Sequence, residues 1–112
     1  MENIKETNKE VAITILEQLG GKRFLAFTGS KDLVCTDNSL NMKLIRNRIG
    51  ATHLTITLMP SDTYKMEFIK VINGNIENNF ETKFIYLKTE TDVYCDMLQD
   101  IFEKTTGLYT HL

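Results

Sequence analysis

The chain has 112 residues, 42% of them hydrophobic, and its 13 Lys and Arg against 15 Asp and Glu give a net charge of −2. This length fits one domain, and the composition excludes an intrinsically disordered chain. No apolar run approaches the ~18 residues of a membrane-spanning helix, and the slight acidity argues against a dedicated nucleic-acid binder. The opening Met-Glu-Asn-Ile-Lys-Glu has no apolar segment behind a basic flank. We therefore expect no secretory signal and a location in the cytoplasm.

The first predicted element is a helix over residues 7–19. Thr7 and Glu10 have the spacing of a capping box at its start, and one apolar stripe follows, made of Val11, Ala12, Ile15, Leu16 and Leu19. The Gly20-Gly21 pair ends the helix, because glycine accepts the left-handed conformation that a helix C-terminus often needs. Since the pair follows a helix and does not lead into one, we expect a structural role and no phosphate-binding loop.

Short runs of β-type composition come next, and turn residues separate them. They cover residues 24–28, 33–36, 40–45, 53–58, 64–72 and 83–88, with turns at 29–32, 37–39 and 60–62. The Asn73-Gly74 pair predicts a type I′ turn at the start of a hairpin, and residues 75–82 form a polar loop. The apolar residues of 83–88 are continuous, which predicts partial burial on both sides or an edge position under the helices.

A second helix is predicted from Thr91 or Asp92 to the region of Gly107. Gly107 occupies the position just after the helix, where Leu108 folds back onto the last turn. The apolar face of this helix consists of Val93, Tyr94, Met97, Leu98, Ile101 and Phe102. A row of carboxylates takes the opposite side as a solvated face, or alternatively as the contact for a basic partner: Asp92, Asp96, Asp100 and Glu103.

These elements predict a single α+β domain over residues 1–112. Clean alternation in the strands is typical of a sheet buried on one face, and each helix has one apolar stripe. We therefore expect a two-layer sandwich: an antiparallel sheet of four or five strands, with the N- and C-terminal helices packed on one face. Most aromatic residues are assigned to the core, including Phe24, Phe27, Phe68, Phe84, Tyr86 and Phe102.

The two cysteines, Cys35 and Cys95, are 60 residues apart, and without a signal peptide we expect reduced, mostly buried thiols. A disulfide is the alternative. A zinc site would have to recruit His53 and His111, and the four residues have none of the close spacings of zinc motifs. We expect neither a metal nor another cofactor.

The open face of the sheet is the candidate site for a partner. His53, Thr55 and Thr57 form a row on one strand, but the chain has no Gly-x-Ser-x-Gly elbow and no carboxylate placed to orient the imidazole, so we expect no catalytic site and no enzyme. A basic cluster at the end of the preceding strand is able to follow a phosphate backbone. The candidate residues for binding a protein or nucleic acid are Lys43, Arg46, Arg48, His53, Thr55, Thr57 and Lys65.

Three stretches carry a resemblance to a known group of proteins. They are TILEQLGGKRFLAFTG at 14–29, NSLNMKL at 38–44 and CDMLQDIFEKTTGLYT at 95–110. They resemble small, largely uncharacterised proteins of bacteriophages and of integrative or conjugative elements in low-G+C Gram-positive bacteria. The resemblance implies an accessory protein of a mobile element and carries over no site residue. The Asn-rich stretch at 73–82 departs from the pattern of the group, which has a shorter link before the last helix.

Two functions from different classes fit these observations. The first is a non-catalytic accessory protein that binds a host or element-encoded protein, for example as an anti-defence, anti-CRISPR-like inhibitor. The alternative is a nucleic-acid-binding accessory protein that uses Lys43, Arg46, Arg48 and His53. We expect no membrane association, and the edge of the sheet allows a homo-oligomer under either function.

Overall fold

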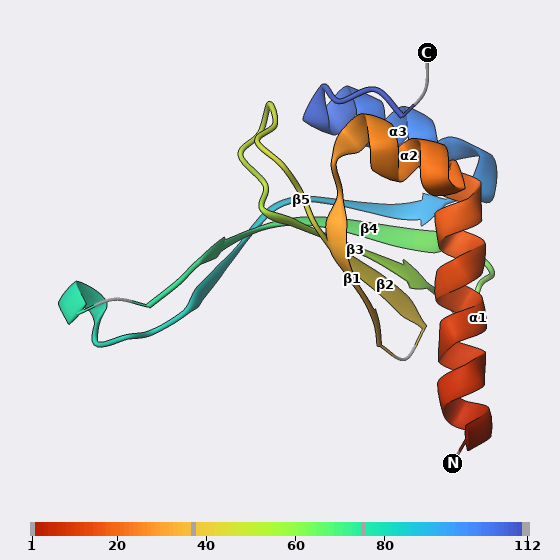
Figure 1. Cartoon of the computed structure of the whole chain (residues 1–112), viewed down its shortest axis with the longest axis horizontal. Helices are drawn as coiled ribbons and strands as arrows, with labels where there is room; N and C mark the ends of the chain where they lie inside the picture. The colour runs from red at the N-terminus through yellow and green to blue at the C-terminus, as the bar shows by residue number, and fades with distance from the viewer. Residues whose placement is uncertain (1, 37, 75, 111–112) are drawn as a thin grey trace.

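One antiparallel sheet of five strands, in the order β1-β2-β3-β4-β5, is covered on one face by three helices (Figure 1). The structure is a computed structural model that describes residues 2–36, 38–74 and 76–110. It confirms the predicted two-layer α+β sandwich. The elements are α1 (Glu2–Leu19), α2 (Gly21–Thr28), β1 (Lys31–Thr36), β2 (Ser39–Lys43), β3 (His53–Leu58), β4 (Tyr64–Ile72), the 3₁₀ turn η1 (Ile76–Asn78), β5 (Lys83–Val93), the 3₁₀ turn η2 (Cys95–Met97) and α3 (Leu98–Thr106).

The core lies between the helices and the sheet face that they cover. Alternate strand residues point into it because side chains along a strand alternate between the two faces. The predicted stripe of α1 also faces the core: Ala12, Ile15 and Leu19 are buried, and Val11 and Leu16 pack at its margin. The largest fully buried side chains are Ile15, Leu19, Phe24, Leu40, Met42, Leu54, Ile56, Met66, Phe68, Val93, Leu98 and Phe102.

Helix α1 begins earlier than predicted, at Glu2, so Thr7 lies inside the helix and not at its N-cap. The Gly20-Gly21 pair ends α1 as predicted, with φ angles of 124° and 61° that favour glycine. The expectation that no helix follows the pair is wrong, because α2 begins at Gly21.

The predicted strand at 24–28 is also wrong, because these residues form most of α2. Phe24 and Thr28, four residues apart, are buried, and Phe27 is 42% exposed. This spacing is helical. The Phe24 ring packs edge-to-face on Phe102 of α3, with centroids 5.0 Å apart, so tertiary packing overrides the β-type composition of the run. Gly29 ends the helix in the left-handed conformation.

The end of β5 and the start of α3 differ from prediction. The strand continues to Val93, which is buried and paired with Tyr64 of β4, so the helix begins only at Leu98. Tyr94 and Met97, expected on the helix's apolar face, are exposed. The carboxylate row is therefore not one helix face: Asp92 lies in β5, Asp96 in η2, and Asp100 and Glu103 in α3. Gly107 ends α3 as predicted, with a φ of 76°.

Two smaller expectations also need correction, and a third falls partly outside the described residues. Asn73 and Gly74 do not form a type I′ turn, and the left-handed pair in the 73–82 connection is Asn79-Phe80. The turn expected at 37–39 includes Asp37, which lies outside the described residues, as do Asn75 and His111. Cys35 and Cys95 are free, as expected, but they are exposed and not buried.

We predict that Phe24→Ala lowers the free energy of unfolding by about 3–5 kcal/mol, because it removes a fully buried ring and its contact with Phe102. Urea unfolding followed by circular dichroism measures the change. Phe27→Ala, in the same helix but 42% exposed, is the matched control and should cost less than ~1 kcal/mol. Equal losses for the two variants would contradict the placement of α2.

Candidate functional site

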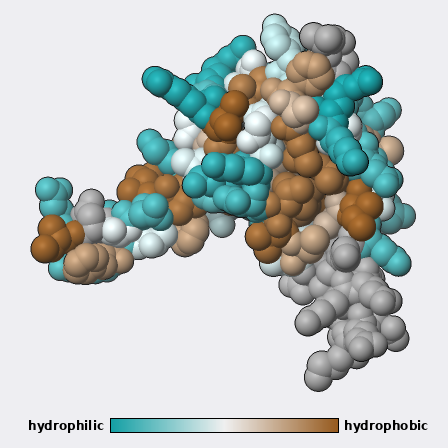
Figure 2. Space-filling model, viewed as in Figure 1, coloured by the Kyte–Doolittle hydropathy of each residue, from teal (hydrophilic) through white to brown (hydrophobic). Residues whose placement is uncertain are grey.

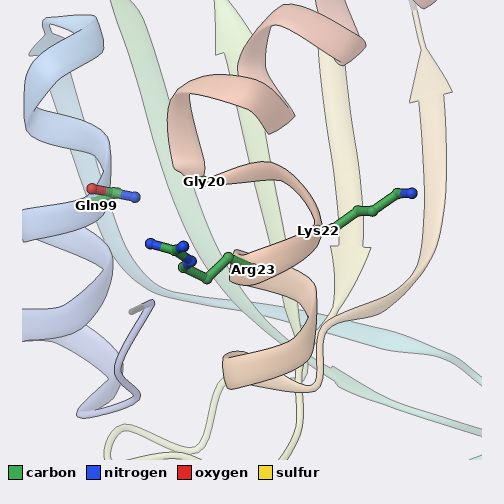
Figure 3. A pocket seen from close by; sticks show the side chains of 4 residues that line it. All are labelled: Gly20, Lys22, Arg23 and Gln99. Atoms are coloured by element: carbon green, nitrogen blue, oxygen red, sulfur yellow. The ribbon is translucent and has the colours of Figure 1, made fainter. Parts of the chain in front are cut away.

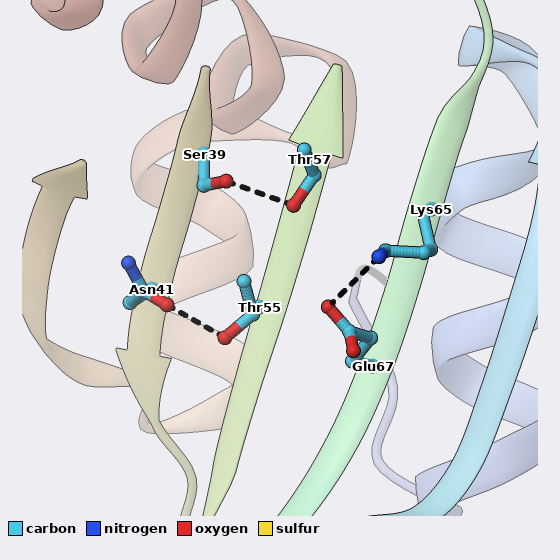
Figure 4. Close-up of polar contacts among 6 residues, drawn as sticks. All are labelled: Ser39, Asn41, Thr55, Thr57, Lys65 and Glu67. Atoms are coloured by element: carbon cyan, nitrogen blue, oxygen red, sulfur yellow. Dashed lines mark hydrogen bonds and ion pairs between the residues drawn. The ribbon is translucent and has the colours of Figure 1, made fainter. Parts of the chain in front are cut away.

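The sheet face opposite the helices carries the polar residues predicted for it. The strand register aligns Lys43 with His53, Asn41 with Thr55, and Ser39 with Thr57, and the same face continues onto β4 (Figure 4). Most of these side chains are half-buried, and Lys43 is exposed. The predicted open face therefore exists.

Hydrogen bonds within the face occupy most of its polar groups. The Thr55 hydroxyl donates to Oδ1 of Asn41 at 2.6 Å, and Nδ2 of Asn41 donates to the Thr36 hydroxyl at 2.8 Å. Ser39 and Thr57 share a hydroxyl–hydroxyl hydrogen bond of 2.8 Å. A ligand for this face would have to replace these bonds, so the net gain from binding here is small.

The charged residues of the predicted site do not converge. Lys65 faces Glu67 at 3.7 Å on the same face. Arg48 instead contacts the end of α3. Its Nη1 donates to the Lys104 carbonyl at 3.1 Å, and its backbone N–H donates to the Thr106 carbonyl at 2.9 Å. A cation there satisfies the terminal carbonyls of α3 and offsets the negative end of its dipole, which is a structural role.

Three exposed cations remain near one end of β1 and β2. Lys31 pairs directly with Lys43 in the sheet, and Arg46 follows β2 in the exposed loop. Like charges directly opposite each other on neighbouring strands cost stability. Of these cations, Lys43 and Arg46 belong to the predicted site, and Lys31 is added by the strand register.

His53 lies beside this basic group. Burial lowers the pKa of its imidazole below the usual 6.5, the nearby Lys43 ammonium lowers the pKa further, and the Asp32 carboxylate acts in the opposite direction. Its Nδ1 is 2.8 Å from the Thr52 hydroxyl. The hydroxyl beside His53 is therefore that of Thr52. Thr55 and Thr57, the other members of the predicted row, form hydrogen bonds with residues of β2 and not with His53.

A pocket of about 510 Å³ lies where α1 gives way to α2, and the sequence did not predict it (Figure 3). It is lined by Gly20, Lys22, Arg23 and Gln99. The Gln99 amide already donates to the Leu19 carbonyl at 2.6 Å, which caps the end of α1. Arg23 points across the pocket towards Gln99, and Lys22 points away from it, so the two cations do not converge on one anion.

The largest departure from a closed sandwich is an arm, which we define as residues 70–86. Pairing between β3 and β4 ends at His53 and Ile69, and beyond this point β5 is the one strand among the described residues that pairs with β4. Figure 1 shows the arm extending away from the body. The radius of gyration, 14.4 Å, exceeds the roughly 13 Å expected for a compact chain of this length, in agreement with this projection.

The root of the arm is fixed by Thr52. Its backbone N–H donates to the Ile69 carbonyl at 2.9 Å, and its hydroxyl accepts from the Val71 N–H at 2.8 Å. One residue therefore holds β4 where that strand leaves β3.

The arm is apolar and exposed. Phe84 and Tyr86 are 62% and 59% exposed, and Ile76 and Phe80 near the tip are 80% and 71% exposed. Figure 2 shows hydrophobic side chains at the tip of the arm and again where it joins the body. The 83–88 run lies in an edge strand, as one of the two alternatives expected, but the burial expected for it, with Phe84 and Tyr86 in the core, is wrong.

The register assigns these aromatic residues to a face. Phe84 pairs with Val71, and Tyr86 pairs with Ile69, which itself faces His53. Phe84 and Tyr86 thus lie on the same side as the polar sheet face, which becomes apolar where it continues onto the arm. We call Val71, Phe84 and Tyr86 of the arm, together with Ile69 at its root, the apolar strip. Phe84 and Tyr86 are its exposed members, whereas Val71 is half-buried and Ile69 is buried.

A sequence signal for this exposure was present. Four apolar residues, 84–87, stand between Lys83 and Lys88. Lysines beside an apolar strand are typical of an edge strand that is protected against unselective pairing with strands of other chains.

Comparisons with protein-family models, curated proteins and solved structures gave no match to this chain. Within the described part of the chain, no group of three or more His, Cys, Asp or Glu is placed to hold a metal ion. No helix formed by those same residues is long and apolar enough to span a membrane.

We predict that His53 makes stability depend on pH. Its pKa is lower in the folded than in the unfolded chain, so the unfolded chain binds more protons as the pH falls through 6.5. The wild type should lose more stability than His53→Gln between about pH 7.5 and about pH 5.5, and the difference should level off below the folded pKa. Urea midpoints across this range measure it, and parallel curves for the two proteins would contradict the shift.

Proposed function

We propose that this chain is a non-catalytic accessory protein that acts by binding another protein, and that the contact is made by the apolar strip of the arm. One observation carries the proposal: large apolar side chains are exposed on a projecting two-stranded segment that has no core of its own. A contiguous exposed apolar patch on a folded domain marks an interaction site more often than chance.

The energetics favour the arm over the polar face. Phe84 and Tyr86 gain little from their own fold because more than half of each is exposed. Each ring that a partner buries contributes roughly 1–2 kcal/mol, whereas the hydroxyls and amides of the polar face only exchange one hydrogen bond for another. Aromatic anchors of this kind dominate many protein interfaces.

Charges around the strip favour a specific partner. Lys83 and Lys88 flank the apolar run, and Lys88 lies 3.5 Å from Glu90. Such residues disfavour unselective edge-to-edge aggregation but leave the aromatic faces accessible.

The setting we propose for this function is the host cytoplasm. The resemblance of three stretches to proteins of phages and conjugative elements supports an accessory protein of a mobile element. An inhibitor of a host defence system, of the anti-CRISPR kind, is the form of this function that such an origin favours.

Nucleic-acid binding is the second candidate, and the Lys31–Lys43 juxtaposition with Arg46 supports it. A phosphate between the two ammonium groups would relieve their repulsion. The proposal ranks below protein binding because Arg48 is engaged with α3 and the chain as a whole is acidic.

A photo-crosslinking amino acid at position 86 tests the arm. We predict covalent adducts with a protein of different sequence in a low-G+C Gram-positive host, because Tyr86 is exposed at the centre of the strip. The same probe at Lys104, exposed on α3, is the control and should not capture that protein. With the captured protein purified, Tyr86→Asp should weaken binding by about tenfold or more. Equal capture from both positions, or unchanged affinity, would refute the proposal.

A fluorescence-anisotropy titration tests the second candidate with labelled single- and double-stranded DNA and RNA. Binding through Lys31, Lys43 and Arg46 should weaken steeply between about 50 and about 200 mM salt, and Lys43→Gln should reduce the salt dependence. Lys70→Gln, which removes one exposed positive charge on the arm, is the control for charge alone. No binding at the lower salt concentration would remove nucleic acid as a partner.

A further inference from the structure

The free edge of β5 is the other unsatisfied feature of the arm. β5 is the last strand of the sheet, and β4 is its only neighbour along Lys83–Val93. The outer backbone N–H and C=O groups of such a strand are able to pair with another strand. The apolar strip lies on one face of the sheet, whereas the free edge is the outer side of β5. A partner bound to the face and a partner paired with the edge therefore do not compete.

We propose that the edge binds a second copy of this chain, β5 against β5 in antiparallel orientation, about a two-fold axis at Ile85. The inference rests on the proposed function, because the dimer doubles the apolar strip that the other protein would contact. A two-fold axis perpendicular to a sheet keeps each face on its own side. Both strips would therefore lie on the same side of a continuous ten-stranded sheet.

The side chains support this register. β5 is regular from Lys83 to Tyr86, and an irregularity in its pairing with β4 follows between Tyr86 and Lys88. With Ile85 on the axis, each Phe84 lies opposite Tyr86 of the other copy, and the two Ile85 lie opposite each other. Aromatic pairs and β-branched pairs are the favourable cross-strand combinations.

The charges also fit an antiparallel copy. In this register Lys83 lies opposite Leu87, and Lys88 lies opposite Thr82. A parallel, in-register copy would instead place each of these lysines against itself, which is destabilising.

Exposed apolar side chains at both ends of β5 give an independent reason for a second copy. Ile76 and Phe80 are exposed at the tip of the arm, and Tyr94 and Met97 are exposed just beyond the other end of the strand, 60% and 39% respectively. Antiparallel pairing about Ile85 brings Phe80 level with Glu90 of the other copy. The tip of each arm then lies beside the C-terminal half of its partner's β5, on the side of Tyr94 and Met97.

A disulfide across the axis tests the register. In a chain carrying Cys35→Ser and Cys95→Ser, Ile85→Cys places two thiols on directly opposed residues, about 5 Å apart at Cα and within the range for a disulfide. Mild oxidation should give a covalent dimer. Lys83→Cys is the matched control on the same edge: its two copies would be about 13 Å apart along the strands, and they should stay unlinked. Equal cross-linking of the two variants would overturn the register.

The mass in solution tests the dimer itself. Light scattering at about 100 µM should give twice the chain mass of 12.9 kDa, and Tyr86→Asp should return the mass to that of one chain with an unchanged circular dichroism spectrum. A single-chain mass for the wild type would overturn the inference. If the position-86 probe still captures a different protein in that case, the proposed function stands without the dimer. If Ile85→Cys links but the probe captures only this chain, the dimer stands and the proposed function fails.

Discussion

Burial of one sheet face under three helices is the constraint on which the rest of the structure depends. The contact between Phe24 and Phe102 joins α2 to α3, and both rings are fully buried beside Phe68 of the sheet in the same core. β3 pairs with β4 only as far as Ile69, and the core extends no further. The parts of β4 and β5 that lie beyond Ile69 in the arm are therefore not covered by the core. The fold thus separates a body with a buried hydrophobic core from an arm on which several large apolar side chains are exposed.

Much of the body could be predicted from the sequence, because its signals are local. The stripe of α1, the alternation in β3 and the glycine after α3 each depend on neighbouring residues, and all three are confirmed. The errors fell where a distant contact decides the structure. The composition of residues 24–28 predicts a strand, but the contact of Phe24 with Phe102 places them in a helix. The pattern around Val93 predicts a helix, but its pairing with Tyr64 of β4 places it in a strand.

The candidate site shows the same division. The polar face was predicted because alternation along one strand fixes which side chains share a face. Its hydrogen bonds to β2 and the engagement of Arg48 with α3 were not predictable, since each joins segments whose pairing the sequence does not specify. The sequence did not predict the arm for a physical reason. A continuous apolar run such as residues 84–87 normally indicates burial, and its exposure becomes evident only once β3 is seen to end its pairing with β4 at Ile69.

Because of the hydrogen bonds of Thr52, the length of the arm does not affect the stability of the domain. Because they hold β4 at the last residue paired with β3, lengthening or shortening of residues 73–82 changes no contact of the core. Loops at such positions tolerate insertion and deletion well. Variation in this segment would then alter how far the tip of the arm, with Ile76 and Phe80, extends beyond the strip, and therefore which protein surfaces the tip meets, at almost no cost to folding.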